Sequence, residues 1–203
     1  MDNFNRVTLC GQVASAPVLS HRNHAVSFYK FTLCVPRLSG QNDELPVIIT
    51  QAQLALAPLQ PGDELTVVGQ LRSFNNKSGE GSRLVISVFA QEILSGGPEP
   101  RNEIWLSGII CKTPTLRRTP LGREICDVIL AVNRHYGRAD YLPCIAWGAV
   151  AAQVARMHTG TRLSIAGRVQ SRTYTKMVGG VPAQRVAYEV SIMHPAEEWE
   201  LLL

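Results

Sequence analysis

Hydrophobic and polar residues alternate in short runs along most of this 203-residue chain, a pattern typical of β-strands. In the second half, the strand-like runs cover residues 104–110, 123–133, 141–147, 163–174 and 184–192. The first half has runs in the same order, with turn residues between them. The pattern therefore predicts a β-rich chain built from short strands.

One segment in each half has helical rather than alternating spacing. Within residues 148–158, Val150, Val154 and Met157 recur at i, i+4 and i+7, which predicts a short helix with one apolar stripe. We assign that stripe to the core, because an apolar stripe on a helix most often packs inward. In the first half Pro58 interrupts residues 51–59, so the helix there should be short or broken.

The two halves are similar in sequence as well as in pattern. Residues 5–11, NRVTLCG, return as residues 102–108, NEIWLSG, at a shift of 97. Phe31 to Arg37 and Leu45 to Ile48 find counterparts at the same shift, and Gly62, Leu65, Gly69 and Ser73 find theirs at a shift of 98. We infer two copies of one domain, below called copy one and copy two.

Five strands with one helix between the third and fourth are the element order of the OB-fold. We therefore predict an all-β chain of two tandem OB-fold barrels. The first domain is assigned to residues 1–96, a Gly/Pro-rich linker to 97–101, and the second domain to 102–196. Gly108, Gly160 and Gly167 suit the bends of a small, curved barrel.

Charge distinguishes the two copies. The net charge is +4, but residues 1–100 hold seven Lys/Arg against eight Asp/Glu, while residues 101–203 hold thirteen against eight. The first part is thus −1 and the second +5. A polyanionic partner should prefer copy two.

Several other classes of function are disfavoured. The five cysteines lack C-x-x-C spacing and should be buried free thiols, and His21 and His24 have no ligand cluster nearby, so we expect no metal and no cofactor. No nucleophile triad, phosphate-binding glycine loop or paired carboxylates stand out, so we do not expect an enzyme. With no 18-residue apolar run and no apolar leader, a cytoplasmic, nucleoid-associated protein without a membrane span is expected.

Copy two resembles the bacterial single-stranded-DNA-binding protein (SSB) family over residues 102 to about 193. The resemblance rests on the motifs N-x-I-x-L-x-G at 102–108, PTLRRTPLG at 114–122, LAVNR at 130–134, DY at 140–141, CIAWG at 144–148 and GRVQSR-x-Y at 167–174. Copy one matches more weakly, through residues 5–11, 31–35 and 61–72.

The resemblance implies a groove in which bases stack on aromatic rings and basic side chains neutralise phosphates. The aromatic candidates are Tyr136, Tyr141, Trp147 and Tyr174, with Tyr136 and Tyr174 expected at strand ends beside loops. The basic candidates are Arg117, Arg118, Arg134, Arg138, Arg168, Arg172, Lys176 and Arg185. Trp105, on the first strand, is expected to pack or to pair subunits.

Strand geometry supports part of this set without the family. Tyr141 and Trp147 share parity on one strand and should point to one sheet face, with Leu142, Cys144 and Ala146 toward the barrel interior. Because every base has a π-face, such rings bind single strands of any sequence.

Copy one departs from the family pattern. Ser39, Glu44 and Thr50 stand where copy two has its first three rings, and only Phe74 offers a ring near the fourth. We therefore expect copy one to contribute little stacking. The chain also ends in EEWELLL, too short for the acidic tail through which family members recruit replication and repair proteins.

The sequence thus favours sequence-tolerant binding and protection of single-stranded DNA in replication, recombination or repair. The resemblance also implies a homodimer with four OB domains, and replication or repair proteins as possible partners. The alternatives are a primosome-type or RNA-binding OB protein, or an assembly or adaptor protein whose DNA face has decayed.

Overall fold

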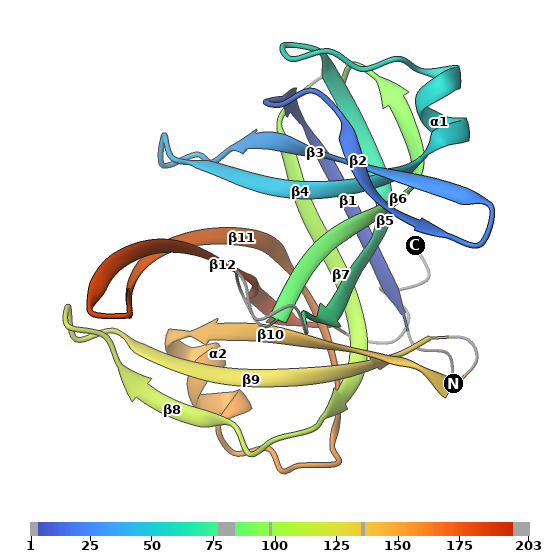
Figure 1. Cartoon of the computed structure of the whole chain (residues 1–203). Helices are drawn as coiled ribbons and strands as arrows, with labels where there is room; N and C mark the ends of the chain where they lie inside the picture. The colour runs from blue at the N-terminus through green and yellow to red at the C-terminus, as the bar shows by residue number, and fades with distance from the viewer. Residues whose placement is uncertain (1–3, 77–83, 98, 135–136, 197–203) are drawn as a thin grey trace. The chain divides into compact units, whose positions relative to one another are not determined.

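The computed structural model describes residues 4–76, 84–97, 99–134 and 137–196 (Figure 1). Packing divides the chain into two compact units that do not coincide with the two halves of the sequence. One unit consists of Arg6–Arg72 and Ile86–Glu103, and the other of Met1–Asn5, Ser73–Val85 and Ile104–Leu203. Residues 73–85 of copy one therefore belong to the unit that copy two forms. The domain limits at 96 and 102 remain a prediction.

In its described residues, copy one forms six strands and one helix. They are β1 (Asn5–Val13), β2 (Val18–Asn23), β3 (Val26–Pro36), β4 (Asn42–Thr50), α1 (Gln51–Leu56), β5 (Glu64–Asn75) and β6 (Leu84–Ser95). Strand β1 pairs antiparallel with β3 and β5, and β3 pairs antiparallel with β2 and β4. Strand β4 pairs with β6 in parallel.

Copy two repeats this arrangement element for element. Its elements are β7 (Arg101–Ile110), β8 (Thr115–Arg118), β9 (Glu124–Asn133), β10 (Ala139–Trp147), α2 (Gly148–Val154), β11 (Arg162–Val178) and β12 (Val181–Pro195). Strand β7 pairs with β9 and β11, β9 with β8 and β10, and β10 with β12 in parallel. The common pairing confirms the predicted all-β class and the OB-fold order of both copies.

Each copy has one short strand that the alternation did not predict. Strands β2 and β8 pair with the edges of β3 and β9, and all their residues are exposed. A strand exposed on both faces has no buried side to give it a period of two, which is why the sequence pattern missed them.

Both helices are short. Helix α1 begins at the Thr50 cap, where Thr50 and Gln53 form a capping box, and it ends at Leu56 before Pro58, as expected. Helix α2 ends at Val154 rather than at 158, and its buried residues are Ala151 and Val154. The expected stripe is thus wrong in part: Val150 is only half-buried and Met157 lies beyond the helix end.

The barrel interior of copy two is lined by alternate residues of neighbouring strands. On β10, Leu142, Cys144 and Ala146 are buried, and their cross-strand partners Leu130, Val128 and Cys126 on β9 are buried too. Opposite residues of an antiparallel pair point to the same face, so these six side chains form one continuous part of the core.

Glycine is required where strand β11 bends. A Cβ on Gly167 would lie 2.3 Å from the Ser191 carbonyl oxygen, and the β11–β12 register shifts between Ala166 and Gly167. The backbone of β12 therefore approaches too closely for any side chain at 167. Gly160 has a different role, since it turns the chain into β11 with φ +91.

All five cysteines are free thiols. Cys10, Cys126 and Cys144 are buried and Cys34 is half-buried, but Cys111 is exposed just after β7, contrary to the expectation of five buried thiols. Burial raises the pKa of the Cys144 thiol, which favours its neutral form at physiological pH. Among the described residues, no helix is long and apolar enough to cross a membrane.

Candidate nucleic-acid interface

Strand β10 presents two aromatic rings on its outer face. Tyr141 is 51% exposed and Trp147 37% exposed, while the alternate residues Leu142, Cys144 and Ala146 are buried. The predicted assignment of the two faces is therefore confirmed.

The surface between the two rings is mixed in polarity. Tyr141 pairs with Ala131 of β9, Pro143 with Ile129 and Trp147 with Ile125, so these side chains share the outer face. Ile125 and Ile145 are buried on this face, which leaves Ala131, Ile129 and Pro143 as its half-buried apolar part. Asp127, opposite Ile145, adds a carboxylate that is paired with Arg117.

The outer face continues across β12 onto β11. Ser191 of β12 pairs with Ile145 of β10 on one side and with Arg168 of β11 on the other. From Arg168 onward, every second residue of β11 points the same way, which brings Arg172, Tyr174 and Lys176 onto this face.

Tyr174 lies inside a long hairpin rather than at a strand end. Strands β11 and β12 run on to Val178 and Val181, and Tyr174 pairs with Arg185. The Arg172 guanidinium lies 5.8 Å from the centre of the Tyr174 ring, within cation–π range. The expectation of a strand-end tyrosine was wrong because the outer part of this hairpin is mostly exposed and has no clear alternation.

Several of the candidate cations form ion pairs. Arg117 binds Asp127, Arg118 lies 3.1 Å from Glu124, and Arg172 lies 3.9 Å from Glu189. The hydrogen bond to Asp127 is the main reason that the pKa of Arg117 is raised, and the charge of Glu189 adds to it. These carboxylates, which the sequence reasoning had not included, offset part of the positive charge of the face.

Arg134 belongs to a hydrogen-bond network that supports the fold. Its guanidinium binds the carboxylate of Asp140, which is fully buried, and also donates to the Ser73 carbonyl at 2.9 Å. Asp140 in turn accepts from the Ser73 N–H, and the Ser73 hydroxyl accepts from the Tyr141 N–H at 2.8 Å. The network therefore anchors the backbone of the strand that carries Tyr141.

The sequence contains a signal for this pair. Copy one has the same Arg–x5–Asp spacing at Arg37 and Asp43, and there too the guanidinium binds a fully buried aspartate. A charge pair repeated at the shift of 97 is better explained by the architecture of both barrels than by binding in one of them.

The remaining candidates have varied surroundings. Arg138 and Lys176 are exposed, Arg185 is half-buried, and Arg168 is half-buried with a buried Nε that has no hydrogen-bond partner in the described part of the chain. Tyr136 lies outside the described residues, as does the acidic C-terminal segment after Ala196. Trp105 is half-buried and meets the His194 ring edge-on at 6.2 Å.

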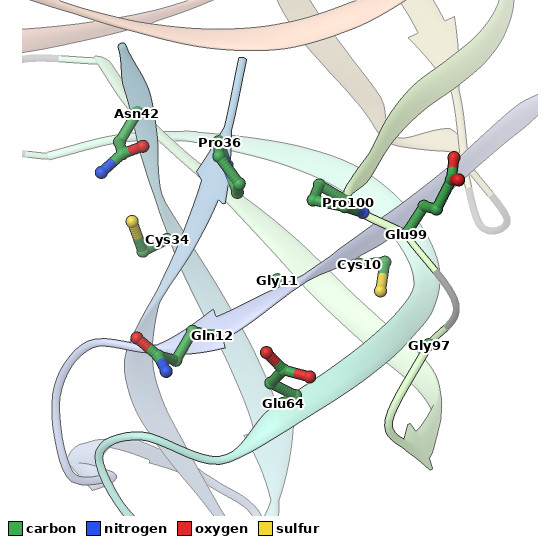
Figure 2. A pocket seen from close by; sticks show the side chains of 10 residues that line it. All are labelled: Cys10, Gly11, Gln12, Cys34, Pro36, Asn42, Glu64, Gly97, Glu99 and Pro100. Atoms are coloured by element: carbon green, nitrogen blue, oxygen red, sulfur yellow. The ribbon is translucent and has the colours of Figure 1, made fainter. Parts of the chain in front are cut away.

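Copy one contains a pocket of about 400 Å³ on its own unit (Figure 2). Cys10, Gln12 and Cys34 line it together with the carboxylates of Glu64 and Glu99. Two carboxylates disfavour a phosphate ligand, so we do not assign this pocket to nucleic-acid binding. In the described ranges, no group of three or more His, Cys, Asp or Glu side chains is arranged to hold a metal ion.

A crystal structure with the same fold covers nearly the whole chain. The wild-type single-stranded DNA binding protein of Thermus aquaticus superposes with a TM-score of 0.76, covering 97% of this chain and 93% of that one, at 22% identity. At this identity the similarity establishes the fold alone.

Sequence comparison identifies the family. The model of the single-strand binding protein family matches residues 101–195. Single-stranded DNA-binding protein B of Bacillus subtilis is 34% identical over 85 residues, which are 38% of this chain and 75% of that protein. Single-stranded DNA-binding protein 1 of Clostridium acetobutylicum is 35% identical over 86 residues, 38% of this chain and 78% of the relative. The match spans only 45% of an Enterococcus faecalis relative. On these matches, the chain belongs to the single-strand binding protein family.

Proposed function

We propose that this protein binds single-stranded DNA without sequence preference, and that copy two provides the main binding face. The observation that carries the proposal is the pair of exposed rings, Tyr141 and Trp147, on one face of β10. The names of the relatives point the same way, since each is called a single-stranded DNA-binding protein.

The dimensions of β10 suit an extended strand of nucleotides. Tyr141 and Trp147 are six positions apart on β10, so the two rings lie roughly 20 Å apart at about 3.3 Å per residue. One base cannot bridge that distance, and each ring therefore stacks a different base. Tyr174 on β11 adds a third ring on the same face.

Phosphate neutralisation falls to the exposed cations around these rings. Arg138 and Lys176 are exposed, and Arg185 lies beside Tyr174. The pairs that Arg117, Arg118 and Arg172 form with carboxylates reduce the local field, so we expect stacking to contribute more to affinity than charge does. Arg134, bound to a buried aspartate, acts on binding through the position of Tyr141.

Further parts of the proposal rest on the family resemblance. We propose a homodimer that brings four OB domains together, action on single strands exposed in replication, recombination or repair, and a cytoplasmic site on the nucleoid. The role is binding rather than catalysis. Sedimentation of the intact chain at micromolar concentration tests the dimer. The measured mass should be twice the monomer mass of 22.3 kDa.

A titration of the intact protein with labelled oligo(dT) and with duplex DNA tests the function. Stacking needs unpaired bases, so oligo(dT) should bind much more tightly than the duplex. Oligo(dC) and oligo(dA) should also bind, because rings stack on any base. Equal affinity for duplex and single strand would contradict the proposal.

A further inference from the structure

Copy one has an aromatic cluster of its own, in positions where copy two has none. The His21 and Phe28 rings are stacked, with centroids 4.8 Å apart and planes 8° from parallel. Phe28 also meets the Phe89 ring at 5.9 Å with a tilt of 46°. The three residues come from three strands, β2, β3 and β6, and together are called the His21 cluster below.

Strand register places the His21 cluster on the outer face of copy one. Phe28 of β3 pairs with Thr50 of β4, and Phe89 of β6 pairs with Ile48 of β4. Thr50 and Ile48 have the parity of Trp147 and Ile145 in copy two at the shift of 97. The cluster therefore lies on the face of copy one that corresponds to the proposed DNA face of copy two.

The cluster is accessible. His21 is exposed, and Phe28 and Phe89 are half-buried. Since Phe28 covers one side of the imidazole, the other side of that ring is left as a flat aromatic surface resting on a second ring. A stacked pair of this kind presents a rigid platform at little cost in side-chain entropy.

The charges near the cluster favour a polyanion. Lys30 is exposed and has the same parity on β3 as Phe28, two residues away. The first turn of α1, which follows Thr50, contains no acidic residue. Glu44 shares this face, but it lies six residues before Thr50 on β4, roughly 20 Å along the strand.

We propose that the His21 cluster is a second stacking platform for single-stranded DNA, on which a base packs against the open side of the His21 ring while Lys30 neutralises a neighbouring phosphate. The proposal rests on the function proposed above. It gives copy one a part in holding long strands, although copy one lacks the rings that the family pattern places in copy two.

The test compares two lengths of oligo(dT) on the intact chain. About 8 nucleotides fit within one OB fold, whereas about 35 exceed what one can cover. The His21→Ala variant should lose at least about fivefold in affinity for the long oligonucleotide, the low end of one stacked base. Its affinity for the short oligonucleotide, which the tighter face of copy two binds, should stay within twofold.

Two further variants distinguish stacking from folding. His21→Tyr retains an aromatic ring and should bind the long oligonucleotide at least as well as the unaltered protein. Leu19→Ala removes an exposed apolar side chain from the same strand, but Leu19 pairs with Tyr29 and so points away from the cluster. It should leave both affinities unchanged.

Photo-crosslinking gives an independent readout. A long oligonucleotide with 5-iodouracil in place of thymine should crosslink to the peptide containing His21 and Phe28, and the short one much less. Unchanged affinity of His21→Ala for the long strand, or equal losses in His21→Ala and His21→Tyr, would overturn the platform. Failure of the unaltered protein to bind either length would instead refute the proposed function itself.

Discussion

The hydroxyl of Ser73 accepts a hydrogen bond of 2.8 Å from the main-chain N–H of Tyr141. Ser73 comes from the end of β5 in copy one, and Tyr141 is the first ring on β10 of copy two, 68 positions along the chain. Together with Asp140 and Arg134, this contact fixes the backbone beneath a proposed base-stacking residue. The backbone of the proposed DNA face is therefore held by a segment of the other repeat.

Removing the Ser73 hydroxyl should loosen this support. In Ser73→Ala the Tyr141 N–H loses its acceptor in a buried setting, at a cost of about 1–3 kcal/mol in the free energy of unfolding. Urea denaturation measures that loss. Ser73→Thr retains a hydroxyl and should recover most of the stability. Equal stability of Ser73→Ala and the unaltered protein would show that the contact contributes nothing.

Breaking the buried ion pair should have a larger effect. Asp140→Asn leaves the Arg134 guanidinium without its counter-charge, and removing one partner of a buried pair costs about 3–5 kcal/mol. Asp127→Asn is the matched control, since its pair with Arg117 is half exposed and should contribute at most about 1 kcal/mol. Thermal denaturation of both variants checks the ranking, and a smaller loss in Asp140→Asn would refute it.

Only part of the fold and of the candidate site could be predicted from the sequence alone. The repeat followed from sequence similarity at a nearly constant shift. The OB order and the face of β10 followed from periodicity, because burial on one side of a strand imposes a period of two. The resemblance placed Arg134 among the phosphate contacts. Its hydrogen bond to Ser73 was not foreseen, because it joins residues 61 positions apart in sequence.

The His21 cluster was missed for a related reason. Strand β2 was not predicted, because all its residues are exposed, and a register shift between Leu19 and His21 changes its parity. Its partners Phe28 and Phe89 lie 61 residues apart in sequence and meet across β4. Contacts of this kind depend on strand order, which local patterns do not specify.

Cations with different partners should contribute differently to the salt dependence of binding. Lys176→Ala should reduce the slope of log K against log salt by about 0.7, the value for one phosphate contact on a single strand. Arg118→Ala should change the slope less, because Glu124 already offsets its charge. Titrations at several salt concentrations measure both slopes, and a larger change in Arg118→Ala would contradict the assignment.

Quenching of tryptophan fluorescence should show directly whether DNA binds on the outer face of β10. With Trp105 and Trp199 replaced by Phe, the remaining Trp147 is 37% exposed and should be quenched when oligo(dT) stacks on it. A second variant retains Trp105 as its tryptophan and lacks Trp147. Its fluorescence should change little when oligo(dT) is added, because Trp105 packs against His194. A strong signal from Trp105 alone would place the DNA elsewhere.

The most direct test of the account is the affinity of the Tyr141→Ala, Trp147→Ala double variant for oligo(dT), measured beside the unaltered protein. Both rings are exposed, so the variant should remain folded, which its melting temperature will show. Each lost stack should cost about 1–3 kcal/mol. The account predicts a loss of at least about thirtyfold with a melting temperature near that of the unaltered protein. Unchanged affinity in a folded variant would contradict it.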